Sequence, residues 1–255
     1  MPELTIVSPH RDDVPFSLCI CLSKWRSIPV RMNVITVFTV SVYAPHASRR
    51  DGNIDTLRSA VTWLRSTEDR FVFRLIDKRI KVDALDLLDA PLRLGISVNS
   101  VCDPKAHPPD SQSGVQTLSC QLRKYVSHNL VLAPLALGNH IDHVTARNAT
   151  ITSARPEKLA FYEDLPYATW TSDASLRHAV RTVESSTGVH LKPFIVRDRG
   201  YAHRKRRVIS QYRSQITAGE AAVIARFALK YRGGERIWVP KQSRAWRALT
   251  VEPYA

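Results

Sequence analysis

The stretch Leu4-Thr-Ile-Val-Ser-Pro-His-Arg-Asp-Asp-Val14 changes from apolar to polar within a few residues. Its apolar part, residues 4–7, predicts a short buried strand that ends at the Ser-Pro pair. Asp12 and Asp13 follow where a helix would begin, a position that favours negative charge, and apolar residues continue over 16–25. The polar residues between strand and helix therefore form either a solvated, capped turn or part of a ligand site, because ligands of α/β proteins bind at strand ends.

Strand-like and helix-like segments alternate along the rest of the chain. Runs dense in β-branched and other apolar residues predict buried strands, and amphipathic or basic segments between them predict helices. Further strands are expected over 32–43, 84–88, 129–137, 158–162, 192–196 and 236–239, and helices over 58–74, 115–127, 140–155, 172–185, 202–215 and 218–230, with a loop at 104–114. This alternation predicts an α/β fold with a mainly parallel sheet that carries helices on both faces.

The composition indicates a folded protein without membrane spans. Of the 255 residues, 44% are hydrophobic and 24% are charged, and we expect a single domain over residues 1–255. The longest apolar stretches are far shorter than the ~20 residues that cross a bilayer, and the N-terminus has no signal-like basic region, so we expect a cytoplasmic protein. The four cysteines form no Cys-x-x-Cys pair and are expected to be reduced core residues.

The chain carries a formal net charge of +14, with basic residues densest over 197–213. Such a positive field could attract a phosphate-bearing substrate, a nucleic acid or an acidic partner, and the charge alone does not choose among them. The basic segment also fits a solvated helix face. A nucleic-acid-binding protein, whose affinity would fall steeply with salt, is therefore an alternative of another functional class.

Two polar clusters carry the residue types of a metal site. The first is His10-Arg-Asp-Asp13 and the second is His140-Ile-Asp-His143, and each comes just after a predicted buried strand. Carboxyl ends of parallel strands share one edge of a sheet, so clusters far apart in the sequence can meet there. Within each cluster the outer residues are three apart, which places them on one face of a helical first turn. Either cluster alone fits helix capping, but the two together favour a shared site.

His10, Asp13 and His143 would supply two imidazoles and one carboxylate. Three such ligands hold a catalytic zinc ion while leaving one position open. A structural zinc ion more often has four ligands, usually including cysteine, and no cysteine lies near either cluster. An open, catalytic site is therefore the preferred hypothesis.

The other members of the clusters suit proton transfer at such a site. Attack of water on an amide needs a base, and the leaving amine needs a proton donor. Asp12 lies next to a predicted ligand and can reach the same water. His140 lies one turn from His143, and we expect Asp142 to hold its ring in one tautomer and to favour the protonated form, which would stabilise an oxyanion.

With these residues in place, the sequence resembles the LmbE/PIG-L family of zinc-dependent N-acetylglucosaminyl deacetylases. The resemblance lies in Ser8-Pro-His-Arg-Asp-Asp13 and Gly138-Asn-His-Ile-Asp-His143, in the order and spacing of the family. Supporting matches extend it over most of the chain: Arg65 with Glu68-Asp69, residues 87–91, residues 162–167 and residues 212–215. Val14 and Gly138 depart from some members, which have Glu and Tyr there, and these departures concern the substrate more than the chemistry.

The resemblance implies a Rossmann-like α/β fold and metal-dependent hydrolysis of an N-acetyl or other N-acyl group on an amino sugar. It also implies that His10, Asp13 and His143 are the metal ligands. Asp12 would be the general base, and His140 the electrostatic or acid residue. Arg65 and Asp89 would contact the sugar. The expected cofactor is zinc. The expected partner is a small amino-sugar substrate, which could bear a phosphate or belong to a natural-product scaffold.

Three alternatives stay open on the sequence alone. The same fold could act as an amidase on a non-sugar N-acyl substrate such as a thiol conjugate, the basic segment could bind nucleic acid, or the chain could keep the fold without activity. Comparing the hydrolysis of acetylated sugars with that of other amides separates the first, and metal analysis tests the last. The sequence gives no oligomeric state.

Overall fold

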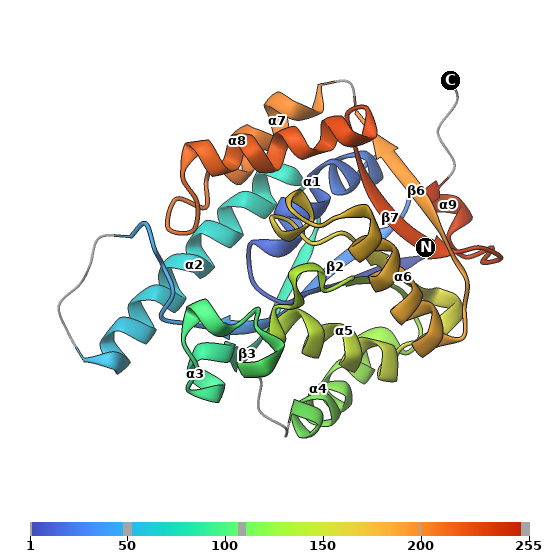
Figure 1. The fold of residues 1–255 in the computed structure, drawn as a ribbon. Helices are drawn as coiled ribbons and strands as arrows, with labels where there is room; N and C mark the ends of the chain where they lie inside the picture. Colours follow the sequence, from blue (N-terminus) through green and yellow to red (C-terminus); the bar gives the residue numbers. More distant parts are fainter. Residues whose placement is uncertain (1, 48–52, 107–110, 199, 251–255) are drawn as a thin grey trace.

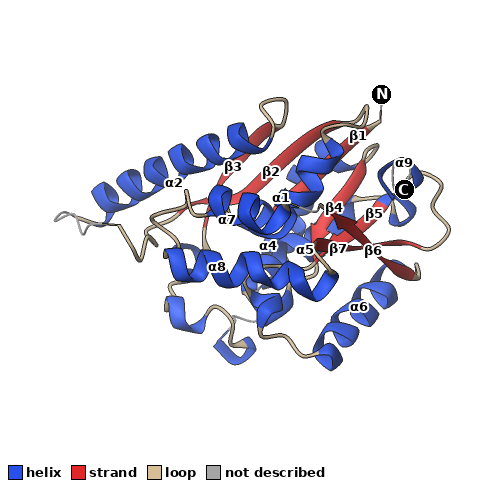
Figure 2. Cartoon of the chain, turned by 90° about the horizontal axis from the view of Figure 1, so that it is seen from above, coloured by secondary structure: helices blue, strands red, loops and turns tan. Residues whose placement is uncertain are grey.

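The computed structural model describes residues 2–47, 53–106, 111–198 and 200–250 and places its strands in one seven-stranded sheet. The strand order is β3-β2-β1-β4-β5-β7-β6, which Figure 2 shows from above. The strands are β1 (Glu3–Ser8), β2 (Arg31–Val40), β3 (Lys81–Leu88), β4 (Leu130–Pro134), β5 (Leu159–Tyr162), β6 (Leu191–Arg197) and β7 (Gly234–Pro240). Strands β1 to β5 pair in parallel, and β7 is antiparallel to both β5 and β6. The predicted mainly parallel sheet is confirmed.

Helices cover both faces of this sheet, as predicted. They are α1 (Asp13–Trp25), α2 (Ile54–Ile76), α3 (Ala90–Leu94), α4 (Ser111–Val126), α5 (Ile141–Ser153), α6 (Asp173–Thr187), α7 (Tyr201–Ile209), α8 (Ala218–Phe227) and α9 (Arg247–Thr250). Helices α1, α2 and α7 pack on one another on one side of the sheet, and α4 packs on α5 on the other (Figure 1). In the described part of the chain, no helix is both long and apolar enough to cross a membrane.

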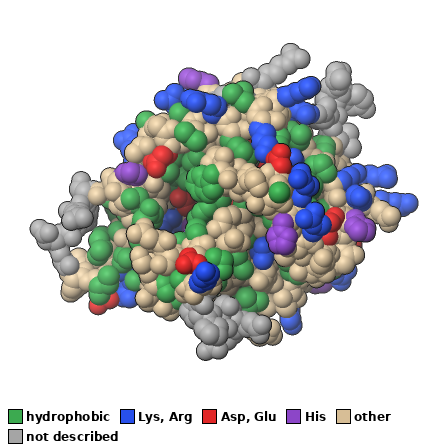
Figure 3. Space-filling model, viewed as in Figure 1, with side chains coloured by type: hydrophobic (Ala, Val, Ile, Leu, Met, Phe, Trp, Pro, Cys, Tyr) green, Lys and Arg blue, Asp and Glu red, His purple; other side chains and the backbone are tan. Residues whose placement is uncertain are grey.

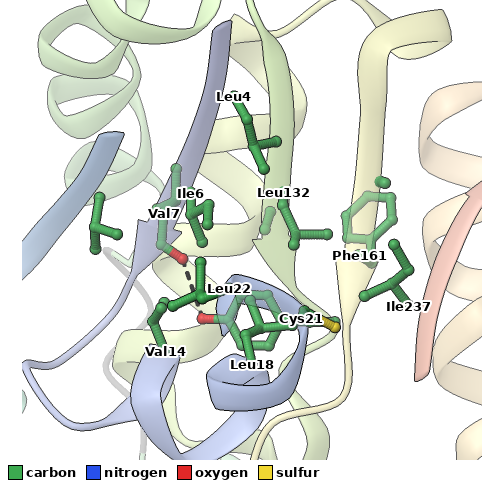
Figure 4. Close-up of a cluster of buried hydrophobic side chains, with 14 of the residues drawn as sticks. Leu4, Ile6, Val7, Val14, Leu18, Cys21, Leu22, Leu132, Phe161 and Ile237 are labelled. Carbon is green, nitrogen blue, oxygen red and sulfur yellow. Dashed lines mark hydrogen bonds between the residues drawn. The ribbon is translucent and has the colours of Figure 1, made fainter. Parts of the chain in front are cut away.

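The apolar runs of the sequence form the core where β1, β4 and α1 meet. Leu4, Ile6 and Leu18 are fully buried in one cluster (Figure 4). Burying each such side chain contributes roughly 1.5–3 kcal/mol to stability. The hydroxyl of Tyr162 in β5 donates a hydrogen bond of 3.0 Å to the carbonyl of Val7. The core thereby fixes the end of β1, where the first polar cluster begins.

The order of the strands reverses beside β1. The chain runs outward from β1 to β2 and β3, and then returns to add β4 on the other side of β1. The loops that follow β1 and β4 therefore diverge at the carboxyl edge of the sheet, which is where open α/β sheets bind ligands. His10 follows β1 and His140 follows β4, so the fold brings both polar clusters to this edge.

The strand expected over 129–137 is shorter than predicted. It stops at Pro134, because Ala136 and Gly138 have φ angles of 59° and 77° that a strand does not allow. The chain instead forms a short 3-10 turn that leads directly into α5. This turn sets the position of the second polar cluster.

Three helices differ from the prediction by four or more residues at one end, and one of them is α2, which begins at Ile54 and not at residue 58. The helix expected over 202–215 stops at Ile209, and the chain turns so that Tyr212 is buried. Helix α4 begins at Ser111, inside the loop expected over 104–114. Residues 107–110 of that loop lie outside the described part of the chain.

The cysteines differ in their surroundings. Cys19 and Cys21 are buried in α1, as predicted, whereas Cys102 is partly exposed and Cys120 is exposed. All four are free thiols. The prediction of core positions is therefore confirmed for the first pair and wrong for Cys120, because it lies on the solvent-facing side of α4.

Candidate active site

The ends of β1 and β4 bring His10, Asp13 and His143 together. Their nitrogen and oxygen ligand atoms all lie within 4.8 Å of one another. Asp13 Oδ2 is 3.2 Å from His10 Nδ1 and 3.3 Å from His143 Nε2. Asp13 is the first residue of α1 and accepts a hydrogen bond of 2.7 Å from the backbone N–H of His10, which fixes the carboxylate at the strand end. The predicted set of two imidazoles and one carboxylate is therefore assembled.

This set fits a metal cation. His143 is fully buried, its Nδ1 lies 2.7 Å from Asp164 Oδ1, and its Nε2 has no hydrogen-bond partner among the described residues. Burial lowers the pKa of His143, but Asp13 and Asp164 outweigh it and raise the pKa well above its usual value. A buried imidazole nitrogen that faces a carboxylate without a hydrogen bond suits a cation, which would take the place of the ring proton.

Asp142 orients His10, whereas the sequence predicted that it would hold His140. Asp142 Oδ2 is 3.0 Å from His10 Nε2 and accepts a hydrogen bond of 2.9 Å from the Ala90 N–H. Its Oδ1 is 2.9 Å from the Arg93 guanidinium. Burial lowers the pKa of His10, but the carboxylates on either side of the ring raise it to about 9. Asp142 therefore fixes the ring orientation of a predicted metal ligand.

His140 is held by the backbone. Its Nδ1 accepts a hydrogen bond of 3.1 Å from the backbone N–H of Asp142, so the ring proton is on Nε2. Burial and the nearby His10 and His143 lower the pKa of His140 to about 2. This geometry favours the neutral ring over the protonated form that the sequence predicted, because Nδ1 accepts a hydrogen bond and the Asp142 carboxylate contacts His10. The neutral ring can instead donate a hydrogen bond from Nε2 in the cavity that it lines.

Asp12 does not cap a helix. It precedes α1 directly, yet its side chain makes no capping hydrogen bond, so the capped-turn alternative is wrong for this residue. Asp12 Oδ1 is instead 3.1 Å from Nη2 of Arg65, a side chain of α2 that is only 6% exposed. The ion pair orients the carboxylate at the wall of the cavity beside the predicted metal ligands.

Arg11 lies between two site residues, and the sequence suggests no role for it beyond contact with solvent. The structure buries it: Arg11 Nη1 is 3.4 Å from Asp69 Oδ2, and the Tyr212 hydroxyl lies 2.7 Å from Asp69 Oδ1 and 3.0 Å from the Arg11 carbonyl oxygen. Burial raises the pKa of Asp69 to about 7. This network ties the loop after β1 to α2 and to the segment after α7, and so positions the first polar cluster.

A cavity of about 350 Å³ opens over these residues. Figure 3 shows this face of the molecule hollowed between α2, α3 and α8, with acidic and basic side chains inside the hollow. Arg65 and Asp89, the predicted sugar-contacting residues, both line the cavity. Asp89 caps the short helix α3 by accepting a hydrogen bond of 3.3 Å from the Leu92 N–H. Helix α3 was not predicted, although an Asp cap followed by Pro91 is a signal for a helix start.

Gly138 makes room for an aromatic side chain beside the site. A Cβ atom at this position would lie 2.5 Å from Cδ1 of Tyr167, and the φ angle of Gly138 is 77°. The Tyr167 ring packs edge-on against His143, with the ring centres 5.1 Å apart. The departure at Gly138 therefore has a structural reason, because a side chain there would displace Tyr167 from the cavity wall.

Asp164 supports the site, although it was not among the predicted site residues. It is the second residue after β5, is fully buried, and contacts His143 Nδ1 through Oδ1 and the Leu137 N–H through Oδ2. Its position just after a buried strand was the available signal. A carboxylate behind a metal-ligating imidazole fixes the ring and increases its basicity.

We expect Asp164→Asn to weaken metal binding by about 10- to 100-fold, because the amide oxygen can still accept from His143 but carries no charge. The affinity is measured by competition with a chromogenic chelator. Glu163→Gln is the matched control, since Glu163 contacts Tyr231, Trp238 and Arg236 and not the site, and its metal affinity should equal that of the wild type. Equal affinities in both variants would show that Asp164 has no part in holding a metal.

Comparisons with known proteins find deacetylases among the chains similar to this one. No family model matches the chain. The 2′-N-acetylparomamine deacetylase of Streptomyces fradiae is 30% identical to it over 237 residues, which are 91% of this chain and 80% of that protein.

Solved structures share the fold. A deacetylase from the biosynthesis pathway of teicoplanin superposes with a TM-score of 0.68 and 20% identity, over 94% of this chain and 99% of that one. The N,N′-diacetylchitobiose deacetylase of Pyrococcus horikoshii gives a TM-score of 0.56 and 19% identity, over 93% of this chain and 84% of that one. The predicted Rossmann-like architecture agrees with these likenesses.

Proposed function

The chain belongs to the family of deacetylases that includes the 2′-N-acetylparomamine deacetylase of Streptomyces fradiae, and we propose that it is a zinc-dependent hydrolase that removes an N-acetyl or other N-acyl group from an amino sugar. The observation that carries the proposal is the position of Asp12. Its carboxylate makes no helix cap and lies beside His10, Asp13 and His143 at the wall of one cavity. The finer assignment to the LmbE/PIG-L family rests on the motifs that contain these residues.

The predicted ligands would hold the metal through three atoms. They are one nitrogen of His10, one carboxylate oxygen of Asp13 and Nε2 of His143, which are already close together. Two imidazoles with one carboxylate form a donor set that zinc accepts in catalytic sites. When bound, zinc supplies a Lewis acid for the acyl oxygen and favours the deprotonation of water.

The remaining residues divide the proton transfers between them. The Asp12 carboxylate, oriented by Arg65, accepts a proton from the attacking water and can later pass it to the leaving amine. His140 donates a hydrogen bond from Nε2 to the oxygen on which negative charge develops. Asp142 acts as a positioning residue, because its carboxylate contacts His10 and not the cavity-facing nitrogen of His140.

The substrate is proposed to be a small amino sugar on a natural-product scaffold. The named substrate of the Streptomyces fradiae relative, 2′-N-acetylparomamine, supports this class. Arg65 and Asp89 are proposed to contact the sugar, because both line the cavity beside Asp12. The cavity volume of about 350 Å³ lies at the lower end of the range for small-molecule sites, which suits one or two sugar rings.

The test is a comparison of substrates for the zinc-loaded protein. We expect acetate release from N-acetylated amino sugars, and rates at least about tenfold lower for N-acetyl amino acids and N-acetylated thiol conjugates of similar size. The reverse order would favour the amidase alternative. Within the basic segment, Lys205 is fully buried against Glu235 and Arg204 pairs with Asp198, whereas Arg206 and Arg207 are exposed, as expected for a solvated helix face.

A further inference from the structure

The cavity is acidic although the chain as a whole is basic. Five carboxylate side chains line it, from Asp12, Asp13, Asp89, Asp142 and Glu220. Among the described lining residues, Arg65 is the one arginine, and there is no lysine. Figure 3 shows that most Lys and Arg side chains on this face lie over its upper and right-hand parts, away from the hollow. The net charge of +14 therefore does not describe the surroundings of a bound ligand.

Two of the carboxylates have an arginine partner within the protein, and a third belongs to the predicted metal-binding set. Asp12 pairs with Arg65 at 3.1 Å, and Asp142 lies 2.9 Å from the Arg93 guanidinium. Asp13 belongs to the predicted metal-binding set. Because the one arginine of the cavity is already paired, it is a poor receptor for a phosphate group.

The other two carboxylates keep an oxygen for a ligand. Asp89 is only 4% exposed, and its described hydrogen bond is the α3 cap through Oδ1. Glu220 uses Oε2 for the capping box of α8, accepting from the Thr217 N–H at 2.7 Å, and the same oxygen faces His46 at 3.4 Å. In the described structure, no hydrogen bond reaches Asp89 Oδ2 or Glu220 Oε1. A carboxylate buried as deeply as Asp89 is costly unless a cation compensates it.

We propose that the substrate carries free ammonium nitrogen besides its N-acyl group, and that Asp89 and Glu220 each offer a carboxylate oxygen to such a group. This inference rests on the proposed function and narrows it to cationic, partly acetylated amino sugars. Asp89 begins α3 and Glu220 lies in the first turn of α8, helices that Figure 1 shows well apart, so the two carboxylates approach a ligand from different sides. A phosphate-bearing sugar would meet uncompensated negative charge at both places.

Two matched pairs of substrates test the proposal at low ionic strength, where charge effects are largest. The first comparison sets N,N′-diacetylchitobiose, which has no free amine, against the two mono-N-acetylchitobiose isomers, each of which has one. The second pair is N-acetylglucosamine with and without a 6-phosphate. We expect kcat/KM to be at least about tenfold higher for one mono-acetylated isomer than for the diacetylated sugar, and about tenfold lower with the phosphate than without it.

Two isosteric variants assign the preference to residues. Asp89→Asn and Glu220→Gln keep a side-chain oxygen for their helix caps and remove the charge. We expect the ratio of kcat/KM between mono- and diacetylated chitobiose to fall about tenfold in the first variant and about threefold in the second, which is more exposed. The ratio cancels any general loss of activity. Glu157→Gln removes the same charge from an exposed site and should leave the ratio unchanged.

The outcomes separate this inference from the proposed function. If neutral and cationic sugars are hydrolysed equally well, or if the preference survives both variants, the ammonium site is refuted while the deacetylase stands. If the phosphorylated sugar is preferred, the cavity selects negatively charged substrates, and the proposed ammonium site is refuted. If none of the acetylated sugars is hydrolysed by the zinc-loaded protein, the proposed function fails and the inference fails with it.

Discussion

Replacing Asp12 with asparagine is expected to lower kcat for deacetylation by about 10²- to 10⁴-fold, the usual contribution of a general base. The amide cannot accept a proton from water, but its oxygen can still accept the hydrogen bond from Arg65. Helix α1 should be unaffected, because the Asp12 side chain does not cap it. Metal content should also be unchanged, since the predicted ligands are other residues.

The measurement for Asp12→Asn combines acetate release with metal analysis of the same sample. Asp83→Asn is the control, because Asp83 lies in β3 and pairs with Lys81, away from the cavity. This variant should keep the wild-type rate. An Asp12→Asn protein that binds zinc and deacetylates as fast as the wild type would refute the role of Asp12 as base.

Replacing His143 with asparagine is expected to abolish metal binding and to lower the rate at least about 10³-fold, because several kcal/mol of transition-state stabilisation depend on the metal. Asparagine is chosen because its amide N–H₂ can take the place of the ring Nδ1–H that contacts Asp164. The substitution therefore removes Nε2, the atom without a hydrogen-bond partner in the described structure, and keeps a partner for the buried carboxylate.

Zinc content and the thermal unfolding midpoint are the two readouts for His143→Asn. We expect a folded, metal-free protein, whose midpoint no longer rises when zinc is added, whereas that of the wild type rises with zinc. A variant that unfolds would be replaced by His143→Gln, which also lacks the imidazole. Full metal content in a folded variant would show that His143 is not a ligand.

The strand ends were predictable from the sequence, and most partners of the site residues were not. The apolar runs before His10 and before His140 ended where the strands end to within a few residues, because both runs are buried on both faces of the sheet. The parallel arrangement then brings the two clusters together. The antiparallel direction of β7 was not predictable, because a short apolar run carries no information about strand direction.

The partner of Asp142 shows that spacing along the sequence does not predict contacts between residues of different strands. Asp142 and His140 are neighbours in the sequence, but the first turn of α5 points the carboxylate toward His10, which comes from another strand. Asp164 reaches His143 in the same way from the end of β5. Such contacts depend on the packing of distant elements, which local periodicity does not record. That residues 1–255 form one domain stays a prediction, which the single sheet of the described residues supports.

Zinc dependence is tested most directly by a zinc titration of the metal-free protein, with acetate release from an N-acetylated amino sugar as the readout. A zinc-dependent enzyme with a single three-ligand site should show no measurable activity after chelation and a linear recovery that ends at about one equivalent of zinc per chain. Activity that survives complete removal of metal, or a zinc-loaded protein that releases no acetate, would contradict the proposed zinc-dependent function.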